Sequence, residues 1–444
     1  MPRVASRTGR PAGAGLPPRG APAPAPARQP SPERPRGGHS ATELIDTVAG
    51  LRGLAEEWDE LSQAASNPAT SPGWILPWLR HVAVADISPR VIAVRDRGVL
   101  VGVVPLYVSQ GRGGVAEYRL MASDFGVCLD PLALPGREWD VAAELARILP
   151  DCRPRPDIVA FGPMCVASHW PAALKASWPG RVPALVRHHD VQGAPVIVLR
   201  DGSFESWFGS LSSKMRNNLR RSERQFERAG GSSRWTTAET LRADAEAFAR
   251  LHTSRWRGRG WSRLSELGSR LPDWIEDVGR DLIDEGRFRM CVLEVEGSPI
   301  CVDFHVLAGD ELSTVNVGWD ARYAKLAPPR LAALRLVEGA CRWGCRRLRL
   351  GCGDHEHKLS LANGNDPVDC SMVIPPSPRL PHAYLSALPV LAHEHARELA
   401  ARSVPQQWVG TIRSLAPGAR ARRRSERPAG SAPQAPRSRR WRRY

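Results

Sequence analysis

The residues best suited to chemistry stand in two short segments of the second half of the chain. Asp303 and His305 are one residue apart within an apolar run, and Glu356 and Lys358 follow the glycine-containing segment 351–353. Residues two apart in a strand point to the same side, so Asp303 and His305 share one face. Carboxylate, imidazole and ammonium groups supply proton acceptors and a cation that binds anions. These four residues are the predicted catalytic groups, with Glu356 as the first candidate base.

A strand meander followed by a helix and one more strand is predicted to position these groups. Three apolar runs are separated by glycine turns, and the helix ends at a glycine suited to a C-cap. The predicted strands are 289–296, 300–307, 312–319 and 347–350, and the helix is 329–343. We expect the helix to direct its positive N-terminal end towards a gap between strands 312–319 and 347–350. That geometry binds phosphate.

A strongly basic helix is predicted over 212–229, with Ser212 as its N-cap. It contains only two acidic residues, so several of its cations have no partner on the helix. Lys214, Arg216 and Arg220 are the residues predicted to bind an anionic ligand. The alternative is a solvated helix laced with ion pairs.

The first half of the chain repeats part of this pattern. Helices are predicted at 44–61 and 74–84, followed by a strand pair at 91–95 and 99–108. The sequence around this hairpin resembles that of 291–307, about 200 residues later. Such a match indicates an internal duplication of a strand-hairpin unit.

The formal net charge of +16 is concentrated at the two ends of the chain. Residues 1–40 contribute +6 and residues 416–444 contribute +9, so the middle is nearly neutral. Both ends are rich in Pro, Ala, Gly and Arg, and we expect them to be disordered. Basic tails bind nucleic acid or anionic membranes weakly. The chain's preference for Arg, with only four Lys residues, favours genome bias over such a role.

Nine cysteines without a CxxC pair are typical of reduced thiols in a cytoplasmic protein. We expect no metal site, because the His-Glu-His segments 355–357 and 393–395 lack a clear third ligand. No apolar stretch is long enough for a membrane span, and no secretory signal is expected.

Two segments resemble a known family. Leu211–Arg221 reads LSSKMRNNLRR, and the region from Val317 to Lys358 contains VGWD, APPR and GCGDHEHK. These segments are similar to motifs of the GNAT-related acetyltransferases typified by CelD-type cellulose-biosynthesis proteins, which are distantly Fem-like. The chain departs from the family pattern in having Pro329 where the family has Gly and His357 where it has Tyr.

The resemblance covers about residues 43–375 and implies an α/β fold. It implies tandem GNAT-like lobes with mixed, mostly antiparallel sheets and flanking helices. The expected lobes are 41–195 and 196–375, followed by a helical extension over 376–415. The implied activity is transfer of an acetyl or other acyl group from acyl-CoA, as co-substrate, to an amine or hydroxyl. The acceptor would be a small molecule or a saccharide, in polysaccharide or envelope metabolism.

The resemblance also implies a binding site for the acyl donor. The expected contacts on the second lobe are Asn316, Val317, Gly318, Lys325 and Arg330, in addition to the basic helix. Two alternatives stay open. One is an aminoacyl-tRNA-dependent transferase of the Fem type, in which the basic helix binds tRNA. The other is a non-catalytic binding protein, which the replacement of Gly by Pro329 favours because proline removes one N–H from the phosphate loop.

Overall fold

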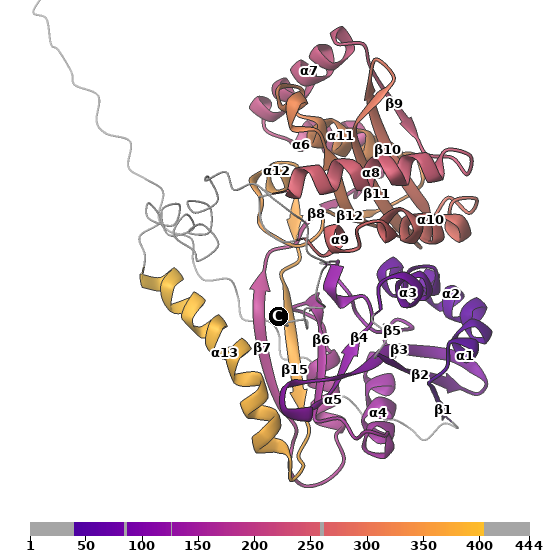
Figure 1. Cartoon of the computed structure of the whole chain (residues 1–444), viewed down its shortest axis with the longest axis vertical. Coiled ribbons are helices and arrows are strands. Elements are labelled where there is room, and N and C mark those ends of the chain that lie inside the picture. Colours follow the sequence, from indigo (N-terminus) through magenta and orange to yellow (C-terminus); the bar gives the residue numbers. More distant parts are fainter. Residues whose placement is uncertain (1–39, 84–86, 126, 258–261, 404–444) are drawn as a thin grey trace, which may run out of the picture. The chain divides into compact units, whose positions relative to one another are not determined.

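A computed structural model describes residues 40–403 apart from 84–86, 126 and 258–261, and only the backbone of residues 40, 112 and 393–403. The predicted disordered tails lie outside the described residues, except for Ser40. Within this range the chain forms two mixed sheets with flanking helices, and the predicted fold class is confirmed (Figure 1).

The first sheet has the strand order β1-β2-β3-β4-β6-β15-β7, with β5 added beside β3. All its neighbours are antiparallel except β4 and β6, which are parallel. The strands are β1 (Ser40–Ile45), β2 (Ser88–Asp96), β3 (Val99–Gln110), β4 (Ala116–Leu120), β5 (Leu132–Ala133), β6 (Ile158–Cys165), β7 (Leu185–Gln192) and β15 (Val368–Ile374).

The second sheet has the order β14-β8-β13-β12-β11-β10-β9, and only β12 and β13 are parallel. Its strands are β8 (Pro195–Val198), β9 (Gly231–Trp235), β10 (Phe288–Val295), β11 (Ser298–Ala308), β12 (Glu311–Trp319), β13 (Arg347–Arg349) and β14 (Gly364–Asn365).

The two sheets repeat one topology. Four antiparallel strands are followed by a parallel one in each, β1-β2-β3-β4-β6 in the first and β9-β10-β11-β12-β13 in the second. The hairpins β2–β3 and β10–β11, which the sequence pairs as a repeat, occupy the same place in the two sheets. The described residues therefore form two lobes whose sheets share one topology.

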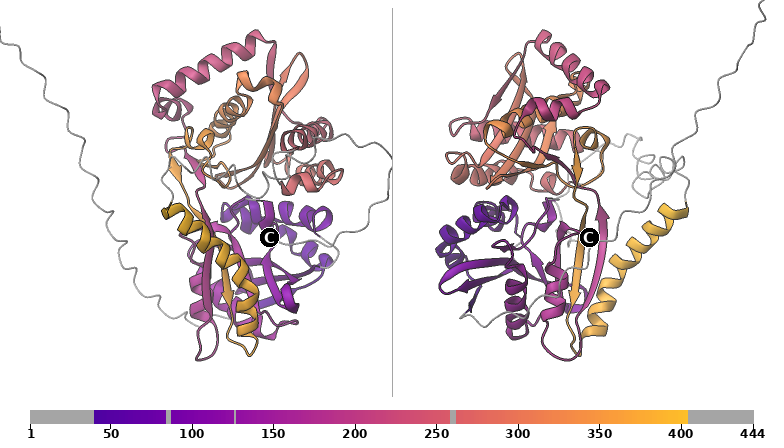
Figure 2. Two further views of the ribbon diagram at one scale, coloured as in Figure 1. Left: turned by 60° about the vertical axis from the view of Figure 1, so that its left-hand side comes forward. Right: turned by 180° about the vertical axis from the view of Figure 1, so that it is seen from behind.

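Helices cover both sheets, and α13 lies along β7 and β15 (Figures 1 and 2). The helices are α1 (Val48–Gly53), α2 (Ala55–Ala64), α3 (Pro72–His81), α4 (Glu138–Ile148), α5 (Trp170–Ser177), α6 (Phe204–Ser210), α7 (Ser213–Arg228), α8 (Leu241–Trp256), α9 (Arg263–Glu266), α10 (Arg270–Leu282), α11 (Pro328–Arg342), α12 (Glu356–Leu359) and α13 (Leu380–Ser403). In the described part of the chain, short 3₁₀ segments lie at 68–70, 112–114, 123–125, 149–151 and 321–326.

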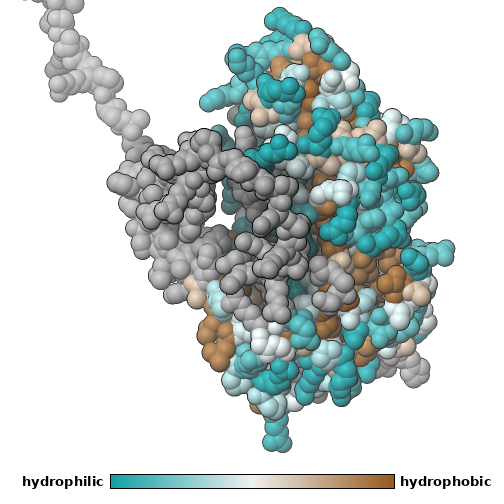
Figure 3. Space-filling view, viewed as in Figure 1, coloured by the Kyte–Doolittle hydropathy of each residue, from teal (hydrophilic) through white to brown (hydrophobic). Residues whose placement is uncertain are grey.

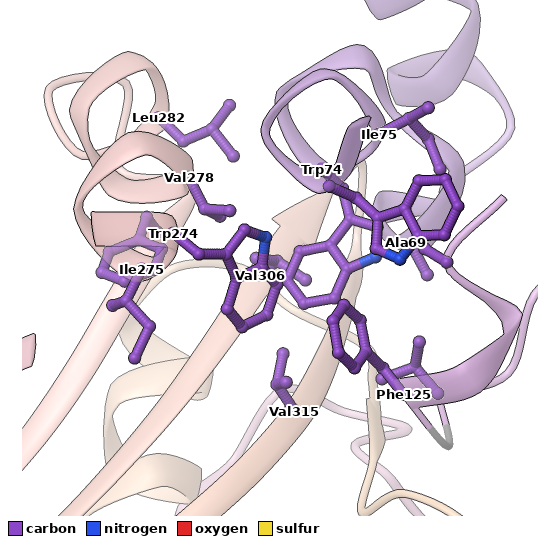
Figure 4. Close-up of a cluster of buried hydrophobic side chains, with 14 of the residues drawn as sticks. Ala69, Trp74, Ile75, Phe125, Trp274, Ile275, Val278, Leu282, Val306 and Val315 are labelled. Carbon is purple, nitrogen blue, oxygen red and sulfur yellow. The ribbon is translucent and has the colours of Figure 1, made fainter. Parts of the chain in front are cut away.

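One apolar core joins the lobes (Figure 4). Trp74 of α3 meets Trp274 of α10 edge-on, with ring centroids 5.0 Å apart, and Phe125 packs against both rings. Both tryptophans are fully buried. Burying each such side chain stabilises the fold by about 1.5–3 kcal/mol, so this core alone holds the lobes together strongly.

Polar contacts reinforce this junction. Arg287 of the second lobe donates to Asp59 of α2, with Nη2 2.8 Å from Oδ1. Arg263 donates to Asp124 at 2.6 Å, and the N–H of Gly309 donates to Gln63 at 2.9 Å. A partly buried guanidinium paired with a carboxylate is better shielded from solvent than a surface pair.

Two sequence predictions differ from the structure. The helix predicted from Leu44 begins only at Val48, because Leu44 lies in β1 and pairs with Ile92. Residues 368–374 fall in the range assigned to the second lobe, yet as β15 they lie between β6 and β7 of the first sheet. Both differences arise from long-range strand pairing, which the local periodicity of the sequence does not reveal.

Candidate functional site

The second sheet opens between β12 and β13. These parallel strands pair over only three residues, from Glu311↔Arg347 to Ser313↔Arg349. After that β13 ends and the chain turns through Gly351, whose φ of 77° suits glycine, while β12 continues to Trp319. A bulge at the β11–β12 pairing, next to His305, disrupts the ladder further. We call this opening the notch.

The ammonium of Lys358 lies in the notch. From α12 it donates to the carbonyl oxygens of Gly351 at 3.2 Å and Cys352 at 2.9 Å. A Cβ placed on Gly351 would be 3.5 Å from Lys358 Nζ and 3.6 Å from the carbonyl oxygen of Thr314 on β12. The ammonium therefore sits close to both diverging strands. Burial lowers the pKa of Lys358, and the nearby Asp303 carboxylate opposes this shift.

Asp303 and His305 lie on β11 and are sealed from solvent, with exposures of 5% and 0%. His305 Nδ1 is 3.1 Å from the hydroxyl of Thr314, and its Nε2 is 3.5 Å from Asp303 Oδ2. Burial raises the pKa of Asp303 well above its usual range and lowers the pKa of His305 to about 3. His305 is therefore neutral at physiological pH.

This cluster contains unsatisfied polar atoms. Among the described residues, neither Asp303 Oδ1 nor His305 Nε2 has a hydrogen-bond partner. Leaving a buried polar atom unpaired costs about 1–3 kcal/mol, so such atoms often mark functional positions. The sequence prediction that Asp303 and His305 share a face is confirmed by the approach of their side chains, with His305 Nε2 3.5 Å from Asp303 Oδ2. They lie beneath the notch, however, and only Lys358 is at its opening.

A basic and aromatic rim surrounds the notch. The guanidinium of Arg255 on α8 stacks over the ring of Trp319, 5.4 Å from its centroid. The rings of His355 and His357 stack at 5.7 Å. Burial lowers the pKa of His357 to about 4, and the neighbouring cations Lys358, Arg255 and Arg330 lower it further. This concentration of positive charge suits an anionic ligand.

The N-terminus of α11 does not offer the expected phosphate loop. Its first two residues, Pro328 and Pro329, have no N–H. The next two N–H groups, of Arg330 and Leu331, both donate to the carbonyl of Ala327, at 2.9 and 3.3 Å. Every N–H of the first turn is therefore missing or already bonded. The predicted helix-end site for a pyrophosphate lacks the free donors that such a site needs.

The other predicted residues lie around the notch or away from it. Glu356 opens α12 and is exposed, with no described side-chain partner. Asn316 and Val317 are half-buried on β12, and the Asn316 side chain accepts from the N–H of Val317 at 2.9 Å. Gly318 is buried against α8, where a Cβ would lie 2.8 Å from the nitrogen of His252. Glycine is therefore required at position 318 for the close packing of β12 against α8.

Lys325 is exposed in the 3₁₀ segment before α11, and Arg330 is half-buried in the first turn of α11. Neither shows a described side-chain hydrogen bond or ion pair.

The basic helix α7 forms as predicted, and Ser212 caps it by accepting from the N–H of Met215 at 3.2 Å. Arg216 is half-buried and donates to the carbonyls of Gly209 and Leu211. Arg220 stacks over the ring of Phe208 at 5.3 Å. These local contacts show that both arginines have a structural role.

Four other cations of α7 are exposed, and the described structure gives them no ion pair: Lys214, Arg221, Arg224 and Arg228. The end of the molecule that bears α7 is mostly hydrophilic in the view of Figure 3. We call these four residues the α7 basic stripe.

Sequence reasoning missed Thr314 and Arg255. A single threonine in a strand and an arginine on a helix carry no pattern that points to a site. Only the pairing of β11 with β12 and the packing of α8 bring them to the notch. Among the described residues, no group of three or more His, Cys, Asp or Glu side chains is arranged to hold a metal ion. None of the described helices is long and apolar enough to cross a membrane.

Comparisons with solved structures support the fold. FemX is 10% identical, with a TM-score of 0.53 over 75% of this chain and 97% of FemX. The C-terminal domain of a protein from Agrobacterium fabrum, provisionally described as a lysylphosphatidylglycerol synthetase, is 11% identical. Its TM-score is 0.50 over 77% of this chain and 96% of that domain. No curated protein matches the chain.

The part of the chain that matches a family model includes the notch. Residues 213–359 match the model of the acetyltransferase (GNAT) domain. This range runs from the start of α7 through the diverging strands to the last residue of α12, and it includes Lys358. The narrower likeness to CelD-type proteins stays a prediction. Residues 213–359 thus form a domain of the GNAT acetyltransferase fold.

Proposed function

We propose that the chain is an acyltransferase whose reaction takes place at the notch between β12 and β13. The observation that carries this proposal is the Lys358 ammonium, held between two diverging strands by the carbonyls of Gly351 and Cys352. The match of residues 213–359 to a GNAT acetyltransferase domain supports acyl transfer as the reaction class.

The chemistry requires an acyl carbon attacked by a neutral amine or hydroxyl. A bond from nitrogen or oxygen to the acyl carbon forms while the bond to the donor's leaving group breaks. The proton that the nucleophile loses is taken up by the leaving group. Lys358 has three N–H donors and uses two on carbonyls, which leaves one for the oxyanion that develops on the acyl oxygen.

Asp303 acts on Lys358 from beneath the notch and does not act as a base itself. In its ionised form, the Asp303 carboxyl group favours the charged form of Lys358 against the effect of burial. His305 is neutral and faces the hydroxyl of Thr314, so it fixes the β11–β12 bulge. Asp303 and His305 are therefore positioning residues, and the proposed contact with substrate is made by Lys358.

Two acyl donors fit different parts of the site. Acyl-CoA is the donor expected of a GNAT domain, and its phosphates would contact the rim residues Arg255, Arg330 and His355. Aminoacyl-tRNA is the second candidate, and two observations favour it. The first turn of α11 offers no free N–H to a pyrophosphate. The α7 basic stripe offers four exposed cations to a nucleic-acid backbone.

Titration calorimetry of the full chain with acetyl-CoA, longer acyl-CoAs and aminoacylated tRNA tests the proposal. Micromolar binding of an acyl-CoA that Lys358→Ala weakens, with Lys175→Ala as the surface control, supports a CoA-dependent transferase. No binding of any acyl-CoA or tRNA by the folded chain refutes acyl transfer.

The salt dependence of tRNA binding distinguishes the donors. If the α7 basic stripe contacts phosphates, replacing Arg221 and Arg224 by Ala lowers the slope of log K against log salt by about 1 per residue. Arg181→Ala, an exposed arginine of the first lobe, is the matched control. An unchanged slope in the double variant places any tRNA away from α7.

A further inference from the structure

Helix α13 turns its larger apolar side chains away from the protein. Its inner face packs on β7 and β15 through Ala383 and Ala387, which are 1% and 3% exposed. Its outer face carries Leu385 and Leu388, which are 62% and 39% exposed. A helix that only covered a sheet would bury its leucines and leave its alanines outside. The outer face is therefore an apolar surface that no described residue covers.

This apolar surface extends over about three turns of the helix. Residues three and four apart on a helix lie on the same face. The exposed residues with this spacing are Pro381, Leu385, Leu388, Pro389 and Ala392. Residues 380–392 contain no Asp, Glu, Lys or Arg, so no charged side chain of the helix interrupts the surface. We call these five residues the α13 apolar face.

Contacts at the N-terminal end of α13 fix the direction of this face. Arg379 donates to the carbonyl of Gly114 at 2.9 Å, and its guanidinium lies 3.2 Å from the Asp157 carboxylate. The His382 ring nitrogen Nε2 is 2.9 Å from the carbonyl oxygen of Gly113. These contacts hold α13 in one rotation about its axis, at the outer edge of the first sheet (Figures 1 and 2).

A strongly basic segment follows α13 in the chain. Residues 416–444 contain ten Arg and one Glu, which gives a net charge of +9. The preference for Arg over Lys extends along the whole chain, yet residues 41–415 are nearly neutral, so this preference does not account for the charge of the segment. Arg420 follows Ser403, the end of α13, by 17 residues, which span at most about 60 Å. The arginines can therefore reach any surface on which the α13 apolar face rests.

An apolar helix face close to a cluster of cations matches the chemistry of an anionic bilayer. Interfacial helices insert an apolar face below the lipid headgroups, and nearby cations are attracted to anionic headgroups. Nucleic acid would pair with the arginines and leave Leu385 and Leu388 in water. A second copy of the chain would cover the leucines but would bring together two segments of charge +9. Of these three partners, the bilayer alone uses both features.

We propose that the α13 apolar face and residues 416–444 bind the chain to the surface of a bilayer that contains anionic lipid. Leu385 and Leu388 enter the boundary between headgroups and acyl chains, while the arginines contact the phosphate groups. The attachment is peripheral, and it takes both signals because one alone gives only marginal binding. This proposal is independent of acyl transfer, since it concerns where the chain is located and not which reaction it performs.

Cosedimentation of the full chain with vesicles tests the proposal. The vesicles contain phosphatidylcholine alone, or phosphatidylcholine and phosphatidylglycerol in equal amounts. We expect the partition coefficient to be at least about tenfold higher on the mixed vesicles. Replacing Leu385 and Leu388 by Ser should lower it about tenfold on these vesicles. Val99→Ser is the matched control, because Val99 is 61% exposed in the β2–β3 hairpin of the first lobe.

The double Ser variant should unfold in urea at the wild-type midpoint, since both leucines are exposed. If it partitions like the wild-type chain, the proposal is overturned, because α13 then does not meet the lipid. A second variant tests the basic segment: replacing Arg420, Arg422, Arg423 and Arg424 by Gln should remove most of the difference between the two vesicle types. High salt should do the same. Equal partition of the wild-type chain on the two vesicle types also overturns the proposal.

The two other partners give distinct results. A wild-type dimer that the double Ser variant dissociates, seen by sedimentation velocity without lipid, assigns the α13 apolar face to a second copy if no vesicle is bound. Binding of tRNA that the four-Gln variant loses, again without binding to vesicles, assigns the arginines to nucleic acid. Either result overturns attachment to a bilayer.

Discussion

Replacing Lys358 by methionine tests the centre of the proposed site. Methionine keeps most of the length and apolar volume of the side chain and removes the ammonium with its three N–H groups. In the folded chain two of these groups are bonded, to Gly351 at 3.2 Å and Cys352 at 2.9 Å. Only the third is available to the substrate, so the variant removes one oxyanion donor.

The expected loss of activity follows from the removal of this single oxyanion donor. Removing one preorganised oxyanion donor costs about 10²–10³ in kcat, which corresponds to about 2.7–4 kcal/mol. The effect on folding is smaller. Two carbonyls lose a charged donor, which costs about 1.5–3 kcal/mol for such a hydrogen bond, but the unfavourable burial of an ammonium is relieved. We expect the free energy of unfolding to change by no more than about 2 kcal/mol.

Single-turnover transfer, calorimetric donor binding and urea unfolding measure these three quantities on the same preparation. Lys175→Met is the control, because Lys175 is an exposed lysine near the end of α5. A Lys358→Met chain that folds normally and transfers within threefold of the wild-type rate contradicts the reasoning. The acyl oxygen would then be stabilised by other groups.

Three further predictions concern the surroundings of the notch. Where Asp303 is ionised, its charge favours the ammonium form of Lys358, so in Asp303→Asn the activity that requires the ammonium should decline at a lower pH than in the wild type. The alkaline limb of a kcat/KM profile measures this, and an unmoved limb argues against the coupling. Pro329→Ala restores one N–H to the first turn of α11 and should tighten acyl-CoA binding about fivefold, as expected of one net hydrogen bond of about 1 kcal/mol. An unchanged dissociation constant means that this turn does not meet the phosphates. Gly318→Ala forces a Cβ to within 2.8 Å of the α8 backbone and should lower the free energy of unfolding by about 1–3 kcal/mol. Gly53→Ala meets nothing within 4 Å and should not destabilise the chain, so equal effects of the two changes would refute the packing argument.

The elements of the second lobe could be predicted because their signals are local. Glycine turns separate β10, β11 and β12, and Ser212 caps α7 with a hydrogen bond to Met215. Where pairing is long-range, the sequence pattern was insufficient. Leu44 has the spacing of a helical residue but pairs with Ile92 in a sheet. β15 joins the first sheet although about 170 residues separate it from β7 in the chain.

In the candidate site, too, local features could be predicted from the sequence and features that depend on long-range packing could not. The alternation of Asp303 and His305 gave their shared face, and the glycines before Lys358 indicated a loop at the end of a strand. Their depth beneath the notch could not be read from the sequence, because it depends on helix packing. No sequence pattern indicated that Asp130 lies in a cavity, which residues of both lobes line. Its position there arises from a contact between residues about 180 positions apart.

The position of β15 has a consequence for how the chain folds during its synthesis. Among the described residues, β7 pairs with β15 alone, and β15 is the last of the described strands to be synthesised. At about 5–20 residues per second, the ribosome needs roughly 10–35 s to reach β15 after it has completed β7. During this interval the edge of β6 and the whole of β7 have no strand partner, and exposed strand edges invite intermolecular pairing. The nascent first lobe must therefore wait for residues 368–374, which makes this interval its period of greatest exposure to aggregation and to chaperones.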